Sequence, residues 1–315
     1  MRRHHGFRGL AAQDQGAAAA IGNFDGVHLG HQSVLALARA AAAERRAPFG
    51  VVTFEPHPRA FFQPDGPPFR LMDADARARR LEKLGVEQLY ELPFDAGLAT
   101  LSAEMFLRRV LAEGLGLRHV VAGADFRFGK GRGGDAALLQ AMGPELGFGV
   151  TIAPLVSDDQ GDFSSTAIRA ALSAGRPEEA ARILGHWHRI EGRVLHGDKR
   201  GRELGFPTAN VGLGALHQPR FGVYAVLVDV LDGPHAGRWR GAANLGERPT
   251  FGVNAPNLEV YLLDFDGDLY GAAVSVALVG FLRPELKFDS VPALVAQMRR
   301  DVADARARLA AVGAG

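Results

Sequence analysis

The sequence contains no cysteine among its 315 residues, which excludes disulfides and cysteine-based metal sites. It lacks a run of about 18 apolar residues, the length that spans a bilayer, and its first residues are too polar for the core of a signal peptide. With a formal net charge of +1, it has no field of one sign that would attract nucleic acid or a membrane. We therefore expect a cytoplasmic protein without a nucleic-acid or membrane partner, and we leave self-association open.

Familiar nucleotide and metal motifs are also missing. No GxxxxGK[ST] sequence occurs, so a P-loop is excluded. Gly129, Gly131 and Gly134 spell GxGxxG, but they do not open a helix directly after the preceding strand, as a dinucleotide site requires. His28 and His31 do not form a helical zinc motif, which needs histidines at i and i+4 with a glutamate between them.

What is present is an ordinary globular composition, 47% hydrophobic and 23% charged, and a length that suggests about two domains of roughly 150 residues each. The first half alternates strand-like and helix-like segments. Strands are predicted at residues 17–21, 50–54, 88–92, 119–122 and 150–155, and helices at 33–43, from Asp73 or Asp75 to Gly85, and 102–113. This alternation predicts a parallel sheet of βαβ units, whose ligands bind at the carboxyl ends of the strands.

The pattern changes near Gly185, after two short predicted helices at 167–174 and 177–185. Short strands separated by Gly, Pro, Asn and Asp follow at 189–194, 222–230, 238–244, 258–264 and 273–282, which indicates an antiparallel barrel or sandwich. A last helix is expected at 291–312, capped by Asp289 or Ser290, with Leu294, Met298, Val302 and Leu309 facing inward. We therefore predict two domains, residues 1–185 and 186–315.

The stretch AAAAIGNFDGVHLGH at 17–31 combines a strand, a glycine-bearing turn and a helix start. The first N–H groups of a helix have no intrahelical partners, and its dipole favours negative charge there. If His28 and His31 both lie in the first helical turn, they share one face. Two imidazoles beside unpaired amides suit a phosphate whose charge grows in a transition state; a purely structural histidine pair is the alternative.

Two further segments of the first half carry polar chemistry. GADFRFG at 123–129 follows a strand and is either a charged, glycine-rich loop or a place where aromatic rings and Arg127 meet a flat ligand and its phosphate. FSSTAIR at 163–169 opens a helix. Its hydroxyls either cap that helix or help Arg169 to hold a phosphate.

In the second half, HGDKRGRELG at 196–205 is either a simple turn or a loop whose amides cradle phosphates. Thr208 and Asn210 would face the same way in an extended segment, and two oxygen ligands suffice for Mg²⁺ that keeps water and phosphate ligands. Glu259 alternates with Leu258, Val260 and Leu262. It is either solvated or, beside a pocket, a base for a substrate hydroxyl.

Taken in order, GNFDGVHLGH, GADFRFG, FSSTAIR, LGFPTAN and LEVYLLDFDGDLYG resemble the motifs of the bacterial bifunctional riboflavin kinase/FMN adenylyltransferases (FAD synthetases). The resemblance runs from about Ala17 to Val302 and begins with the HxGH signature of the nucleotidyltransferases. It implies a Rossmann-like HxGH nucleotidyltransferase domain, followed by an antiparallel β-barrel riboflavin kinase domain with a C-terminal helix. It also implies phosphorylation of riboflavin to FMN by ATP with Mg²⁺, then transfer of AMP from ATP to FMN, giving FAD and pyrophosphate.

The resemblance further implies roles for individual residues. In the first domain, the implied catalytic pair is His28 and His31. ATP and its phosphates would bind at these two histidines and at Gly22, Asn23, Asp25, Ser164, Ser165, Thr166 and Arg169. Flavin would bind at Pro56, His57, Phe62, Asp125, Arg127 and Phe128. In the second domain, Glu259 is the implied catalytic base, and flavin would bind near Arg283. ATP would bind at Gly197, Lys199, Gly205, Thr208 and Asn210, and Mg²⁺ would bind at Thr208 and Asn210. Tyr261, where the family commonly has histidine, and Pro284 depart from its pattern.

Two other functions remain as alternatives. An HxGH enzyme could adenylylate pantetheine phosphate or a nicotinamide mononucleotide, but those families lack a barrel that carries the PTAN sequence. The barrel could instead store flavin or bind RNA, although the near-neutral charge disfavours RNA. An ATP-turnover assay with riboflavin would separate storage from catalysis.

Overall fold

The computed structural model describes residues 1–159, 161–196, 204–248 and 255–312, and the chain divides into two compact units. The first comprises Met1–Pro67 and Ala74–Phe163, and the second comprises Pro68–Asp73 and Ser164–Gly315. This division places the segment between Phe163 and residue 185 with the second unit, whereas the domain boundary predicted from the sequence groups that segment with the first domain. Each unit is described by itself.

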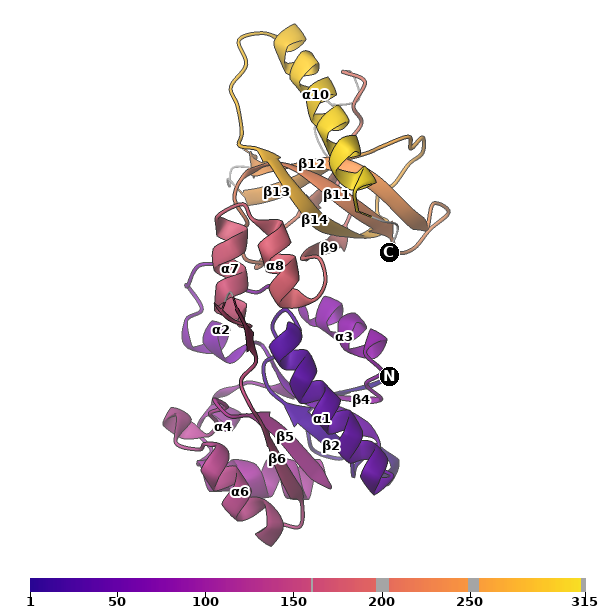
Figure 1. Ribbon diagram of the computed structural model, residues 1–315. Helices are drawn as coiled ribbons and strands as arrows, with labels where there is room; N and C mark the ends of the chain where they lie inside the picture. Colours follow the sequence, from indigo (N-terminus) through magenta and orange to yellow (C-terminus); the bar gives the residue numbers. More distant parts are fainter. Residues whose placement is uncertain (160, 197–203, 249–254, 313–315) are drawn as a thin grey trace. The chain divides into compact units, whose positions relative to one another are not determined.

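The first unit is built on a six-stranded parallel sheet in the order β1-β4-β3-β2-β5-β6. Its strands are β1 (Arg2–His5), β2 (Ala18–Ile21), β3 (Phe49–Glu55), β4 (Gln88–Pro93), β5 (His119–Gly123) and β6 (Gly149–Ala153). From β2 the chain adds strands on one side and then returns to add β5 and β6 on the other (Figure 1). The end of β2 is therefore a topological switch point, where such sheets bind ligands.

Helices and short elements complete the first unit. They are η1 (Ala12–Asp14), α1 (Leu29–Arg45), α2 (Pro58–Phe62), α3 (Ala74–Lys83), α4 (Ala96–Ala99), α5 (Ala103–Met105), the π-helix η2 (Phe106–Gly114), η3 (Lys130–Arg132), α6 (Ala136–Glu145), β7 (Ser157–Asp158) and β8 (Gly161–Asp162). The predicted strands of the central sheet are confirmed. The pattern analysis did not predict β1, α2 or α6.

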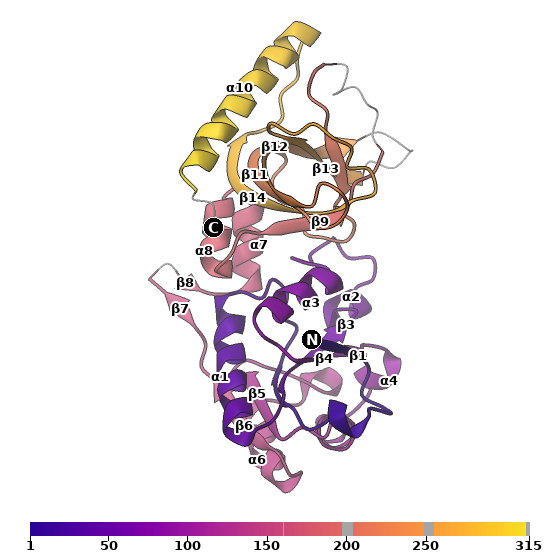
Figure 2. The ribbon, with the colours of Figure 1, turned by 90° about the vertical axis from the view of Figure 1, so that its right-hand side faces the viewer.

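The second unit is an antiparallel six-stranded sheet in the order β10-β13-β12-β11-β14-β9. Its elements are α7 (Ser165–Ser173), α8 (Pro177–Leu184), β9 (Arg189–Arg193), β10 (Ala209–Gly212), β11 (Gly222–Val230), β12 (Gly237–Arg248), β13 (Ala255–Leu262), β14 (Ala273–Arg283) and α10 (Val291–Ala310). A bridge between Leu195 and Asn210 brings the two edges together. The sheet thus forms a nearly closed barrel, seen from one end in Figure 2, as the resemblance implied.

The C-terminal helix α10 is present, but its buried face differs from the prediction. Ser290 caps it by accepting a hydrogen bond from the Ala293 N–H at 3.3 Å. Of the four residues predicted to face inward, Leu309 is buried and Leu294, Met298 and Val302 are half-buried, and the buried face also contains Asp301 and Ala305. The prediction followed apolar residues alone. Asp301 is buried because an arginine of β14 binds it, as described below.

Candidate active sites

The turn after β2 brings the two histidines of the HxGH motif together. His28 is the N-cap of α1, and its Nδ1 atom accepts a hydrogen bond from the His31 N–H at 3.3 Å. The two rings stack with their centroids 3.6 Å apart. The predicted placement of both histidines at one helix start is confirmed.

Burial controls the charge of His31. It lowers the pKa of His31 well below its ordinary value, and the neighbouring His28 lowers this pKa further. The Nδ1 atom of His31 has no hydrogen-bond partner among the described residues. The imidazole of His31 is therefore held in its neutral form.

Two features of the backbone shape the turn. Phe24 and Val27 adopt left-handed conformations, with φ of 52° and 45°, each of which costs about 1–3 kcal/mol for such residues and is characteristic of functional sites. At position 30, a Cβ would lie 3.1 Å from atoms of the His28 ring and from the Phe163 carbonyl oxygen. Glycine in the HxGH motif therefore leaves room for the imidazole.

An exposed aromatic cluster follows the carboxyl ends of β3 and β4. Phe62 is 65% exposed and makes edge-to-face contacts with Phe61 at 5.2 Å and Phe94 at 5.7 Å. His57 caps the short helix α2 by accepting a hydrogen bond from the Arg59 N–H at 3.0 Å, and Pro56 precedes it. Such a surface suits a flat ring system. Phe94 was not singled out in the sequence, although its position directly after a predicted strand was a usable signal.

The GADFRFG segment is held by contacts within the first unit. Arg127 forms an ion pair with Asp135 at 2.9 Å, and Asp135 caps α6. Phe128 is 5% exposed and packs on Phe106 and Phe126, so its ring belongs to the core. Contacts of Asp125, Arg127 and Phe128 with flavin remain predictions.

The FSSTAIR segment continues into the second unit. Ser164 caps α7 by accepting a hydrogen bond from the Ala167 N–H at 3.2 Å. The guanidinium of Arg169 donates to the Phe69 carbonyl at 3.4 Å and to the Thr166 hydroxyl at 3.5 Å. Because the histidine pair belongs to the first unit, participation of Ser164, Ser165, Thr166 and Arg169 in its site remains a prediction.

In the barrel, Asn210 of β10 is the direct cross-strand partner of Glu259 on β13. Leu258, Val260 and Leu262 are buried while Glu259 is half-buried, so the predicted alternation is confirmed. Asn257 donates a hydrogen bond to the Asn210 Oδ1 atom at 3.0 Å. Residues directly opposite on neighbouring strands share a face, so Asn210 and Glu259 lie on the same face of the barrel sheet.

A cavity of about 370 Å³ opens in the second unit, within the range of small-molecule sites. Asn210 and Glu259 are not among the residues that line it. Its lining includes Val194, Pro207, Thr208, Leu262, Asp268 and Tyr270. Thr208 thus borders a pocket and stands two residues before Asn210. Gly205 adopts a φ of 83° that favours glycine, whereas Gly197 and Lys199 lie outside the described residues.

Comparison with known proteins identifies the family. The FAD synthetase family model matches residues 10–167, and the riboflavin kinase family model matches residues 184–309. A bifunctional riboflavin kinase/FMN adenylyltransferase from Pseudomonas fluorescens is 46% identical over 98% of this chain and 97% of its own. One from Escherichia coli K12 is 41% identical over 94% and 93%. This chain belongs to the bifunctional riboflavin kinase/FMN adenylyltransferase family.

A solved structure supports the same architecture. The crystal structure of a protein from Streptococcus pneumoniae, described as a macrolide-efflux protein, aligns with a TM-score of 0.83 and 33% identity over 95% of this chain and 97% of its own. Within the described part of our chain, no helix has the length and apolar character needed to cross a bilayer.

Two positions noted against the family pattern have defined surroundings. Tyr261 packs edge-to-face on Phe206, with ring centroids 5.3 Å apart. Arg283, next to Pro284, donates two hydrogen bonds to the Asp301 carboxylate of α10, at 2.8 and 2.7 Å. The guanidinium of Arg283 therefore already has a carboxylate partner. The contact of Arg283 with flavin remains a prediction.

Proposed function

We propose that this chain phosphorylates riboflavin to FMN with ATP and then transfers AMP from a second ATP to FMN, releasing pyrophosphate and forming FAD. The observation that carries the proposal is that the two family models match successive, non-overlapping parts of one chain. Each part also contains its own cluster of chemically suited residues, the histidine pair after β2 and the Asn210–Glu259 pair of the barrel.

For adenylyl transfer, His28 and His31 bind the ATP phosphates at the start of α1. A phosphate oxygen of FMN attacks the α-phosphorus, and pyrophosphate leaves with the electrons of the broken bond. The amides of the helix start and the imidazole N–H groups stabilise the charge that grows on the phosphate oxygens. The exposed ring of Phe62, supported by Phe61 and Phe94, holds the flavin. No covalent intermediate is needed.

For phosphorylation, Glu259 accepts the proton of the riboflavin hydroxyl as its oxygen attacks the γ-phosphorus of ATP. Thr208 and Asn210 supply neutral oxygens for Mg²⁺, and the donor set fits: one lone pair of the Asn210 Oδ1 atom is used by Asn257, which leaves a second. Held there, the ion would supply positive charge that offsets the negative charge developing on the phosphates of ATP. The 370 Å³ cavity bordered by Thr208 accommodates the nucleotide.

The cellular context belongs to the same proposal. A cytoplasmic location fits the absence of cysteine, because reducing compartments do not support disulfides. We propose no nucleic-acid partner, in line with the near-neutral charge, and self-association stays open to direct measurement.

The test is to incubate the purified chain with riboflavin, ATP and Mg²⁺ and to resolve FMN and FAD by chromatography. His28→Ala should reduce FAD formation from FMN by about 10²–10³-fold and leave FMN formation intact. Glu259→Gln is the reciprocal control and should reduce FMN formation by about 10²–10⁴-fold while FAD formation from added FMN continues. Unchanged FAD formation in His28→Ala would refute the assignment of the first site.

A further inference from the structure

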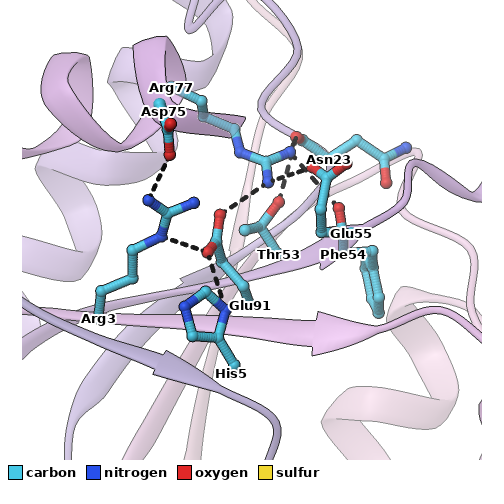
Figure 3. Close-up of polar contacts among 9 residues, drawn as sticks. All are labelled: Arg3, His5, Asn23, Thr53, Phe54, Glu55, Asp75, Arg77 and Glu91. Carbon is cyan, nitrogen blue, oxygen red and sulfur yellow. Dashed lines mark hydrogen bonds and ion pairs between the residues drawn. The ribbon is translucent and has the colours of Figure 1, made fainter. Parts of the chain in front are cut away.

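A network of charged side chains lies next to the turn between β2 and α1, residues 22–28, which we call the nucleotide turn (Figure 3). Its centre is Arg77 of α3, whose side chain is 1% exposed. One terminal nitrogen donates to Glu55 at 2.9 Å and to Glu91 at 3.2 Å. The other donates to the backbone carbonyls of Asn23 at 3.4 Å and Phe54 at 3.5 Å. A single guanidinium thus contacts the segments that end or follow β2, β3 and β4.

The Asn23 carbonyl has a second donor from the sheet itself. Thr53, which is fully buried, donates its hydroxyl hydrogen to this oxygen at 3.2 Å. In a planar trans peptide, the C=O and the following N–H point in opposite directions. Holding the Asn23 carbonyl therefore also fixes the direction of the Phe24 N–H, at the residue where the turn enters the left-handed region with φ of 52°.

The N-terminal strand completes the charge balance. Arg3 of β1 donates to Glu91 at 2.5 Å and to Asp75 at 2.6 Å. The hydrogen bond to Glu91 raises the pKa of Arg3, and the hydrogen bond from Arg3 lowers the pKa of Asp75. Glu91, whose side chain is 1% exposed, therefore lies between two arginines and orients both.

Such a network is a poor way to gain stability alone. A buried ion pair contributes little more than apolar residues of the same volume, because both charges must be desolvated. Apolar residues, however, cannot donate hydrogen bonds, so they could not hold the Asn23 carbonyl in one direction next to Phe24, whose φ is positive. Left-handed non-glycine residues persist only where the surroundings fix them, and the side chains of Arg77 and Thr53 both donate to the Asn23 carbonyl.

We infer that Arg77 and Thr53 are positioning residues for adenylyl transfer: through the Asn23 carbonyl they hold the nucleotide turn in the conformation that binds the phosphates of ATP. Arg77 also fixes Glu55, next to the Pro56 segment predicted to border the flavin. This inference rests on the proposed function, because the turn is assigned to ATP there. Neither residue touches substrate.

The experiment uses the full chain and its kinase activity as an internal control. Thr53→Val removes one hydroxyl at nearly constant shape, and Arg77→Lys keeps the charge but loses the planar fork. Each should lower kcat/KM for ATP in FAD formation by about tenfold, the effect of one hydrogen bond, with a higher KM for ATP and unchanged riboflavin phosphorylation. The double variant should lose less than the product of the single effects, because both donors act on one oxygen. Arg79→Met, an exposed arginine of the same helix, should behave as wild type.

The outcomes separate the alternatives. A merely structural role would reduce the active fraction and the melting temperature but leave KM for ATP unchanged, and that result would overturn the inference. So would folded variants that make FAD as wild type does. If Arg77→Lys fails to fold, Thr53→Val decides alone. A wild-type chain that makes no FAD would refute the proposed function itself, and this inference with it.

Discussion

His188 is a buried histidine that the fold keeps neutral. It is 2% exposed, and its Nε2 atom has no hydrogen-bond partner within the described residues. Burial, assisted by His217 and His186, lowers its pKa from 6.5 to about 3. Below pH 6.5 His188 becomes protonated in the unfolded chain but stays neutral in the folded chain. The free energy of unfolding is therefore highest above pH 6.5 and falls as the pH is lowered toward 3.

We therefore expect the free energy of unfolding of the second unit to fall by about 2 kcal/mol between pH 6.5 and 5 through this residue. His188→Leu should remove that part of the pH dependence, measured by urea unfolding at each pH. His235→Leu, at a half-exposed position of the same unit, should retain it. An unaltered pH profile in His188→Leu would mean that other groups account for the acid sensitivity.

At the residue scale, local spacing sufficed where the chemistry is local. The i and i+3 separation of His28 and His31 predicted their shared position, and the alternation around Glu259 predicted its face. The burial of Arg77 could not be predicted in this way, because Arg77 belongs to a basic run at 77–83, and such runs are typical of a solvated helix face. Its partners Glu55 and Glu91 come from other strands, so only the fold brings them to this arginine.

At the scale of the element, the ion pair between Arg283 and Asp301 is more buried than another ion pair that joins α10 to the barrel, Arg306 with Asp264. Arg283 and Asp301 have side-chain exposures of 17% and 7%, and Gln297 donates a further hydrogen bond to Asp301 at 2.9 Å. Removing the charge of Asp301 leaves a mostly buried guanidinium without its anion, which is costly.

Asp301→Asn should accordingly lower the free energy of unfolding of the second unit by about 2–3 kcal/mol, measured by urea denaturation. Asp304→Asn, an exposed aspartate on the same helix, is the matched control and should change it by less than about 0.5 kcal/mol. Equal effects of the two substitutions would show that the ion pair does not stabilise the docked helix.

The elements that sequence patterns missed are those whose stability comes from outside them. β1 has the sequence RRHH, which contains no apolar residue and no alternation. It forms a strand because its backbone pairs with β4 and because Arg3 meets Glu91. β2, β3 and β5, by contrast, contain runs of β-branched or small apolar residues, and such runs predict buried parallel strands without knowledge of their neighbours.

At the scale of the whole molecule, the boundary predicted from the sequence, residue 185, differs from the boundary between the two compact units, which lies between Phe163 and Ser164. We propose residue 185 from the sequence, yet α7 and α8 make close contacts with the barrel. The Arg220 N–H donates to the Leu172 carbonyl at 2.9 Å, and Arg308 of α10 pairs with Glu178. A Cβ at Gly175 would lie 3.4 Å from the Phe281 ring.

These contacts predict that a fragment of residues 164–315 is more stable than one of residues 186–315. The shorter fragment uncovers the apolar surface that Leu172, Ile183 and Leu184 bury, and we expect its melting temperature to be lower by about 10 °C. Both fragments lack Pro68–Asp73, so the comparison isolates the two helices. Equal melting temperatures would instead support residue 185 as the structural boundary. If only the longer fragment folds and phosphorylates riboflavin, then the helix that opens with Ser164 is part of the kinase's structure, whatever it contributes to adenylyl transfer.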